Sequence, residues 1–137
     1  MKITVEGLEA LITEVNEIAD TQILERNLGK ACALVEGSAK RKAPKGIGAL
    51  RNSITSKVEN MEGIVFTPLE YAPYVEFGTG LYAEGGNGRK DVPWVYQDDE
   101  GKWHSTSGMK PQPFMRPALL ENREKIIRIL QEGLLND

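Results

Sequence analysis

The sequence has little of the residues on which most protein chemistry depends. Its 137 residues include one cysteine, Cys32, and one histidine, His104. A single cysteine excludes an internal disulfide and fits a reducing compartment, and one cysteine with one histidine cannot complete a closed zinc site. No hydrophobic run approaches the ~20 residues that a membrane-spanning helix needs. We therefore expect a soluble, cytosolic protein without a membrane segment or a secretory leader.

Catalytic and cofactor-binding patterns are also missing. Glycines are dense over residues 78–91, but their spacing fits neither a Walker loop nor a dinucleotide-binding fingerprint. His104 has no partner in the sequence that would orient it or act as a nucleophile. Asp98, Asp99 and Glu100 are adjacent acids in a predicted turn, which are more often solvated than bound to metal. We expect no catalytic residue, no cofactor and no metal; an enzyme or host-directed protein would need a ligand pocket around His104.

What the sequence does contain is typical of one globular domain. Hydrophobic residues make up 40% and charged residues 27%, which are ordinary values for a folded protein. A chain of 137 residues is long enough to bury a core of its own. We therefore expect a single domain over residues 1–137.

The charges are unevenly distributed along the chain. Residues 37–57 contain six bases and no acid, whereas acids exceed bases in 1–36 and in 58–110. We define the basic strip as five of these residues: Lys40, Arg41, Lys42, Lys45 and Arg51. Such a strip can face DNA or an acidic partner, and it is also typical of a solvated helix end whose cations complement the helix dipole.

Periodicity predicts helices towards both ends. Apolar residues at helical spacing predict a short helix over residues 5–18 and a second helix that ends near Lys42, before Pro44. Cys32 lies on the apolar stripe of the second helix, which favours a small core side chain over a nucleophile. A long C-terminal helix is predicted from Arg116 to Leu135, with a stripe of Leu119, Leu120, Ile126, Ile127, Leu130 and Leu134.

Two β-hairpins are predicted between the helices. The first pairs residues 50–59 with 63–67, and the second pairs 94–96 with 102–104 around an acidic turn closed by Gly101. The predicted fold class is α+β: a small antiparallel sheet of hairpins packed against N-terminal helices and a long C-terminal helix. Five glycines in residues 78–91 predict a mobile loop, so we expect a mobile, glycine-rich arm at about 78–110.

The arm is rich in aromatic residues. Aromatic side chains on a projecting hairpin are typical anchors of protein–protein contacts, and the alternative is a hairpin that folds back and buries them. The candidate interface with another subunit or partner consists of Tyr82, Trp94, Tyr96 and Trp103.

Two segments are more specific than their composition. One is YAPYVEFGTG at residues 71–80, and the other is PQPFMRPAL at residues 111–119. Together with Pro44 and GALRNSI at residues 48–54, they occur in the order and at the spacing of a phage family. The chain resembles the HK97 gp10-like tail-component proteins of tailed bacteriophages and prophages, over roughly residues 5–134. Ile47 stands where the family usually has threonine or a similar residue before Gly48.

The resemblance implies a non-enzymatic virion protein of the phage neck. Such a protein joins the head connector to the tail, or completes the head-proximal end of the tail, as a six-fold ring. Its partners would be the connector or adaptor and the tail terminator, with non-specific contact to genomic DNA and no membrane. It would assemble in the host cytoplasm, and the free protein can stay monomeric. The alternatives are a tail terminator and a non-specific nucleic-acid-binding accessory protein.

The two diagnostic segments are expected to act in the architecture first. Tyr71, Tyr74 and Phe77 share a helical face, which favours core positions, with Pro73 in the first turn and Gly78 at the exit. Glu76 is expected to point away from that face and to cap the helix, pair with Arg116 or reach a neighbouring subunit. The family-motif positions with structural roles are Tyr71, Pro73, Tyr74, Glu76, Phe77, Gly78, Pro113, Phe114, Arg116 and Pro117.

Overall fold

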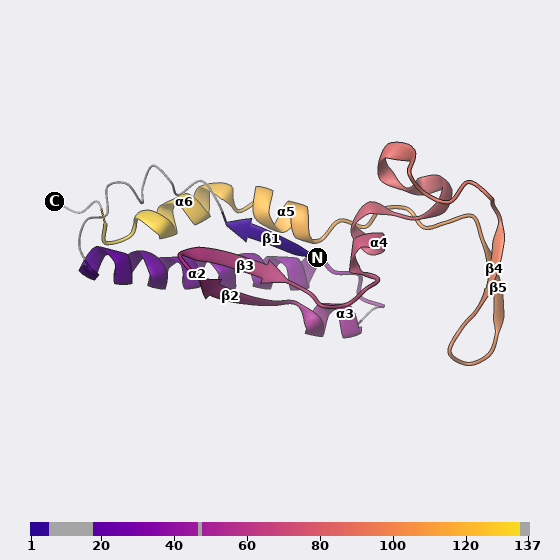
Figure 1. The fold of residues 1–137 in the computed structure, drawn as a ribbon, viewed down its shortest axis with the longest axis horizontal. Helices are drawn as coiled ribbons and strands as arrows, with labels where there is room; N and C mark the ends of the chain where they lie inside the picture. The colour runs from indigo at the N-terminus through magenta and orange to yellow at the C-terminus, as the bar shows by residue number, and fades with distance from the viewer. Residues whose placement is uncertain (6–17, 47, 135–137) are drawn as a thin grey trace. The chain divides into compact units, whose positions relative to one another are not determined.

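The computed structural model describes residues 1–5, 18–46 and 48–134 (Figure 1). These residues group into two compact units: unit 1 is Met1–Pro68 with Phe114–Asp137, and unit 2 is Leu69–Pro113. The segment expected to form an arm, 78–110, lies within unit 2. The predicted helix over residues 5–18 falls almost entirely outside the described residues.

Unit 1 contains a three-stranded antiparallel sheet in the order β1-β3-β2. β2 (Thr55–Glu59) and β3 (Glu62–Phe66) form the predicted first hairpin, with Val58 opposite Gly63. Asn60 and Met61 both have positive φ, 52° and 62°, as a two-residue turn matched to the strand twist requires. The other edge is β1 (Lys2–Val5), a strand that the sequence analysis did not predict.

Helix α2 (Ile18–Lys42) forms the core of unit 1 with this sheet and the C-terminal helices (Figure 1). Every third or fourth residue along one side of it is buried, as the stripe predicts. The helix ends at Lys42, before Pro44, which also confirms its predicted end. The buried positions of the predicted stripe are Leu24, Leu28, Ala31, Cys32, Val35 and Ala39.

The segment before β2 is helical, so the prediction of a strand from Leu50 was wrong. Residues Gly48–Ser53 form the short helix α3, and the strand begins at Thr55. The Ser53 hydroxyl donates to the Leu50 carbonyl oxygen at 2.7 Å and also bonds Thr67 at 2.6 Å. Serine that bonds a carbonyl three residues back favours a helix end over a strand. Leu50 is fully buried.

The long C-terminal helix is divided in two, which corrects the prediction of one continuous helix. α5 is Met115–Leu120 and α6 is Arg123–Gln131. Between them, Asn122 has φ −103° and ψ 9°, and its side-chain amide donates to the Ala118 carbonyl oxygen at 2.8 Å. Asparagine competes in this way with the backbone for hydrogen bonds, which makes it a weak helix former. Both helices pack on α2.

Unit 2 contains α4 (Ala72–Phe77), two short 3₁₀ helices, η1 (Gly80–Tyr82) and η2 (Glu84–Gly86), and a second hairpin. β4 (Trp94–Gln97) and β5 (Trp103–Thr106) pair antiparallel, with Tyr96 opposite His104. The second predicted hairpin is therefore confirmed, and the fold of the described residues is α+β.

Residues 79–81 and 107–109 bond to one another at the base of this hairpin, and we call this contact the clasp. The Thr79 N–H donates to the Met109 carbonyl oxygen and the Leu81 N–H to that of Ser107, both at 2.9 Å. The Met109 N–H donates to the Thr79 hydroxyl oxygen at 2.9 Å. A Cβ on Gly80 would overlap the Ser107 carbonyl oxygen, since the two backbones lie so close. Here glycine provides close approach, a role distinct from the mobility expected of it.

Candidate interaction surfaces

The YAPYVEFGTG segment forms α4, and its faces are the reverse of the prediction. Ala72, Val75 and Glu76 are buried, whereas the aromatic side chains are exposed. Tyr74 is 59% exposed, and Tyr71 and Phe77 are 38% and 39% exposed. The aromatic face was therefore wrongly predicted to be core. It is an exposed face of α4 in this structure.

Glu76 lies on the buried face of α4 and has no exposed surface. The prediction that its carboxylate reaches a neighbouring subunit is wrong, because that role requires exposure. The predicted positions of the two backbone-limiting residues are confirmed: Pro73 lies in the first turn, and Gly78 ends the helix with φ 83°. A Cβ on Gly78 would lie 2.8 Å from the Tyr82 carbonyl oxygen and 2.9 Å from that of Met109.

The PQPFMRPAL segment leads into α5. Phe114 is completely buried in the core, and Pro117 lies in the first turn of α5 as predicted, where its missing N–H leaves no helical bond unmade. Pro113 is exposed and Arg116 is half-buried. Phe114 and Pro117 therefore occupy positions consistent with the structural roles proposed for this segment.

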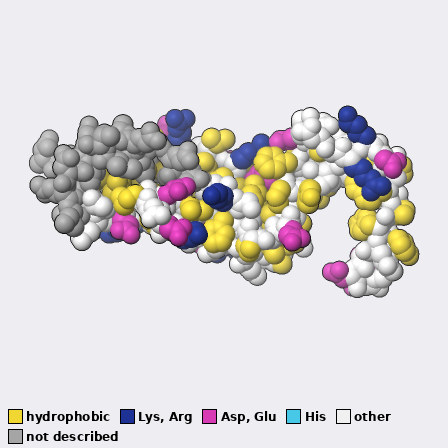
Figure 2. All heavy atoms as spheres, in the orientation of Figure 1, with side chains coloured by type: hydrophobic (Ala, Val, Ile, Leu, Met, Phe, Trp, Pro, Cys, Tyr) yellow, Lys and Arg dark blue, Asp and Glu magenta, His cyan; other side chains and the backbone are white. Residues whose placement is uncertain are grey.

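The β4–β5 hairpin carries most of the candidate interface residues. Trp103 is 68% exposed, and Tyr96 and Tyr82 are also exposed. Trp94 is half-buried, with the Arg89 guanidinium 5.0 Å from its ring centroid. Figure 2 shows hydrophobic side chains along this hairpin and an acidic side chain at its turn. The aromatic residues are thus available to a partner, and their role as an interface stays a prediction.

The turn of this hairpin is organised by Asp98. Its Oδ1 accepts the N–H groups of Glu100 at 2.9 Å and Lys102 at 2.8 Å, and its Oδ2 lies 2.7 Å from His104 Nε2. The side-chain hydrogen bond to His104 is the largest cause that lowers the pKa of Asp98, followed by the bond from Lys102. The imidazole also stacks on Tyr96 with 5.2 Å between ring centroids. His104 therefore has a clear structural role in the turn.

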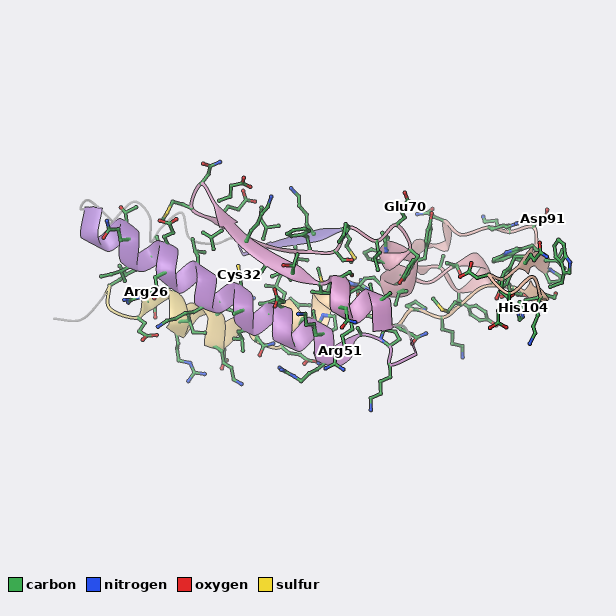
Figure 3. All side chains as sticks on the ribbon, turned by 90° about the horizontal axis from the view of Figure 1, so that it is seen from below. Arg26, Cys32, Arg51, Glu70, Asp91 and His104 are labelled. Atoms are coloured by element: carbon green, nitrogen blue, oxygen red, sulfur yellow. The ribbon has the colours of Figure 1, made fainter. Side chains whose placement is uncertain are left out.

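The basic strip runs from the C-terminal end of α2, through Lys45 in the following turn, to Arg51 on α3, which Figure 3 labels. Two of its cations are already paired: Lys40 lies 3.4 Å from Glu36, and Lys42 lies 2.5 Å from Glu121. Arg41, Lys45 and Arg51 are exposed and form no ion pair within the described ranges. The strip offers three free cations where the sequence predicts five.

A further exposed surface was missed because its apolar residues were assigned to the core. Leu120 on α5 is 66% exposed and Ile127 on α6 is 45% exposed, whereas Ile126 and Leu130 are buried. Adjacent residues on a helix differ by about 100° in direction, and here Ile126 faces the core whereas Ile127 faces solvent. Spacing alone does not decide which neighbour is exposed, since adjacent Ala31 and Cys32 are both buried on α2.

The remaining chemistry of the described residues is limited. They contain no group of three or more histidine, cysteine or acidic side chains placed to hold a metal ion. None of the helices described is both long and apolar enough to cross a membrane. Cys32 is buried on α2, and burial raises the pKa of its thiol to about 11.

A comparison with known protein families matches a stretch of the chain that includes α4. Residues 8–78 match the model of the HK97-gp10-like family, described as "Bacteriophage HK97-gp10, putative tail-component". The chain belongs to this family. The match includes the GALRNSI segment and ends at Gly78, so it covers α4 and not the β4–β5 hairpin or the PQPFMRPAL segment. No curated protein and no solved structure matches the chain.

Proposed function

We propose that this protein is a structural component of a tailed phage or prophage that joins the head connector to the tail or completes the head-proximal end of the tail. The observation that carries the proposal is the family match over 8–78, a family of phage tail components. Such proteins act through contacts, and the described residues present exposed aromatic side chains on α4 and on the β4–β5 hairpin. It acts by assembling into a ring on the axis along which the genome passes.

The partners in this proposal are proteins of the neck and the tail. A hexameric ring would contact the connector or adaptor on one side and the tail terminator on the other, and the free chain would assemble in the host cytoplasm before it enters the virion. Exposed aromatic anchors such as Trp103 suit these contacts, because aromatic residues supply large contact area with few rotatable bonds.

A role in binding DNA is supported less well. Two of the five residues of the basic strip are engaged by Glu36 and Glu121. The three free cations are Arg41, Lys45 and Arg51, and no aromatic residue lies between them in the sequence. In sites for single-stranded nucleic acid, bases stack on aromatic rings. Contact between the strip and genomic DNA would therefore be limited to phosphate groups.

Deletion of this gene from its parent phage tests the proposal. We expect negative-stain microscopy of the lysate to show filled heads and separate tails, and complementation with the wild-type gene to restore joined particles. A tail terminator would instead give tails of irregular length. Infectious particles of normal form in the deletion strain would overturn the structural role.

A matched pair of complementing variants tests the hairpin within this function. Trp103→Ser removes the most exposed aromatic side chain of the hairpin, whereas Tyr82→Ser changes an aromatic residue outside its strands. We expect Trp103→Ser to lower the yield of joined particles at least tenfold and Tyr82→Ser to lower it less. Equal yields from both variants and the wild type would exclude a role for the hairpin in joining.

A further inference from the structure

We propose that the β4–β5 hairpin of one copy of this chain docks on the outer face of α5 and α6 of a second copy. The proposal rests on the proposed function, since it names the two surfaces through which the ring would assemble. It follows from the apolar and charged residues that each surface exposes.

The donor surface is one face of the hairpin. Val95 pairs with Ser105 and Gln97 with Trp103 across the two strands, and residues directly opposite one another share a face. Val95 is exposed, as is Trp103, so this face presents an uncovered apolar surface. A two-stranded hairpin is only marginally stable in water unless one face packs against something.

The turn beside this face is acidic. Asp99 is exposed, and Glu100 is 79% exposed with its carboxylate 3.9 Å from Lys102. Asp98 is occupied by its bonds within the turn. The donor surface therefore consists of two apolar side chains, Val95 and Trp103, followed by two accessible carboxylates.

The acceptor surface is the outer face of the C-terminal helices. Ala118, Ile126 and Leu130 are buried on the side that packs on α2. On the solvent side lie Leu120, Arg123, Ile127 and Arg128, all exposed. Arg123 and Arg128 form no ion pair within the described part of the chain.

The two surfaces are complementary in both apolar and charged character. The apolar pair Leu120 and Ile127 would cover Val95 and Trp103, and the guanidinium groups of Arg123 and Arg128 would meet the carboxylates of the turn. Two acids also lie on these helices. Glu121 is paired with Lys42, and Glu124 forms no ion pair within the described ranges. Opposite charges set the orientation and partner of such a contact.

The basic strip is a weaker acceptor for the same hairpin. It has free cations in Arg41, Lys45 and Arg51, but the described residues of 37–57 include no exposed large hydrophobic residue. Docking there would leave Trp103 and Val95 in water. The α5–α6 face satisfies both requirements.

A contact between different surfaces of identical chains is heterologous. Each copy offers one hairpin and one α5–α6 face, so every subunit joins two neighbours, and the arrangement closes into a ring where the rotation permits. The donor surface consists of a few residues of one hairpin, whereas a standard stable interface uses roughly 20–30 residues on each side. Pairwise association is therefore expected to be weak.

Charge reversal in the purified full-length chain tests this contact. The hairpin variant is Asp99→Lys with Glu100→Lys, and the helix variant is Arg123→Glu with Arg128→Glu. At about 1 mM, a concentration at which even a millimolar dissociation constant leaves much of the protein associated, sedimentation velocity is expected to show oligomers for the wild type and monomers for each variant alone. An equimolar mixture of the two variants is expected to restore the oligomers, because every contact in it again joins opposite charges.

Two matched controls separate this contact from a general effect of charge. Glu59→Lys with Glu62→Lys reverses two acids beside the turn of the β2–β3 hairpin, and Lys45→Glu with Arg51→Glu reverses two bases of the strip. Both are expected to associate like the wild type. Loss of oligomers in the strip variant alone would show that the basic strip is the acceptor and would overturn the proposal. A monomeric wild type would also overturn it, and so would an equimolar mixture of the hairpin and helix variants that forms no oligomers.

A cross-link provides a second measurement that does not depend on charge. Val95→Cys in one chain and Ile127→Cys in another are expected to form a disulfide-linked dimer under mild oxidation, with the buried Cys32 unreactive. Val95→Cys with Glu59→Cys is the control and is expected to stay monomeric. Absence of the first dimer overturns the contact, whereas normal particles from the deletion phage would overturn the proposed function and leave the contact standing.

Discussion

Burial determines the chemistry of the single cysteine. The sequence placed Cys32 on the apolar stripe of a helix, and in the structure it is 1% exposed, with burial raising the pKa of its thiol to about 11. A raised pKa means that the thiolate, which is the reactive form, is almost absent at neutral pH.

We therefore predict that Cys32 does not react with a thiol-specific disulfide reagent at pH 8 in the native protein and reacts fully in denaturant. An added Ser105→Cys at an exposed position is the positive control, and its thiol should react within the mixing time. Absorbance of the released thiolate measures both. Rapid reaction of Cys32 in native buffer would show that α2 opens readily.

Asn27 is a buried amide that joins the two ends of unit 1's sequence. Its Nδ2 donates to the carbonyl oxygens of Leu130 at 3.1 Å and Glu132 at 2.8 Å, which satisfies backbone groups at the end of α6. Asn27→Ala should lower the free energy of unfolding by about 1–3 kcal/mol because these buried acceptors lose their donor.

Asn27→Asp should cost more than Asn27→Ala at pH 7, since it places a carboxylate against two carbonyl oxygens. Urea unfolding measures each variant. Asn52→Ala, at an exposed position of α3, is the control and should change stability by less than about 0.5 kcal/mol. Equal values for Asn27→Ala and Asn52→Ala would contradict the assigned bonds.

At the scale of residues, prediction from the sequence was wrong where hydrophobic side chains are exposed and a charged side chain is buried. Tyr71, Tyr74 and Phe77 share a helical face, and the opposite face of α4 buries Ala72, Val75 and Glu76. Both faces repeat at helical spacing, so periodicity locates the helix and cannot choose its inner side. Judged by hydrophobicity, the aromatic face would be buried, but the fold buries the face that carries the Glu76 carboxylate. No pattern in the sequence indicates which face of α4 is buried.

Among the elements, the clasp provides the sharpest test of the role of glycine. Gly80 has φ 59°, and a Cβ there would overlap the Ser107 carbonyl oxygen; Gly86 has φ 69°, and a Cβ there would meet nothing within 4 Å. The two positions share a left-handed backbone, but only Gly80 is buried and in close contact with another backbone segment.

Gly80→Ala should therefore destabilise unit 2 more than Gly86→Ala, which should cost only the ~1 kcal/mol of a left-handed alanine. Hydrogen exchange of the Leu81 and Met109 amides reports on the clasp, because both donate across it. Equal loss of protection in the two variants would mean that backbone strain, rather than close approach, explains the glycine.

The turn of the β4–β5 hairpin should depend on pH through Asp98. The pKa of Asp98 is lowered from 3.8, chiefly by its bond to His104. A carboxyl with a lowered folded pKa stabilises the turn fully above its unfolded pKa, and the stabilisation disappears as the pH falls through the folded value.

Amide chemical shifts of Glu100 and Lys102 should therefore change below about pH 4 as Asp98 is protonated. Asp98→Asn removes the charge and should abolish that change while keeping one side-chain acceptor oxygen. A hairpin whose shifts are insensitive to Asp98→Asn would contradict the role of the carboxylate in the turn.

The elements themselves were largely predictable. Both hairpins were found from their turns, and α2 was found from its stripe and from Pro44. The errors lie where a side chain competes with the backbone: Ser53 bonds back to Leu50 and ends a helix, and Asn122 bonds back to Ala118 and divides another. β1 was missed because four residues, Lys2–Val5, carry too short a pattern to identify a strand that forms by pairing with β3.

For the whole molecule, charge argues against strong binding to DNA. The net charge is −3, and the structure leaves three of the five cations of the basic strip unpaired. Binding through phosphate contacts alone weakens steeply with salt.

We predict that the purified protein does not bind a labelled DNA duplex measurably at about 150 mM salt and binds weakly at low salt. Fluorescence anisotropy measures both, and Lys45→Glu with Arg51→Glu should remove the low-salt signal. Binding that survives at 200 mM salt or more would favour the nucleic-acid-binding alternative.

The clasp also has a consequence for how the chain can diversify. It holds the start and the end of residues 80–108 side by side, so the segment between them begins and ends at the same place. The family match stops at Gly78, one residue before the clasp begins. Hydrogen bonds between residues 79–81 and 107–109 hold the two ends of this segment together. A change of length or sequence between those ends therefore need not alter the path of the flanking backbone.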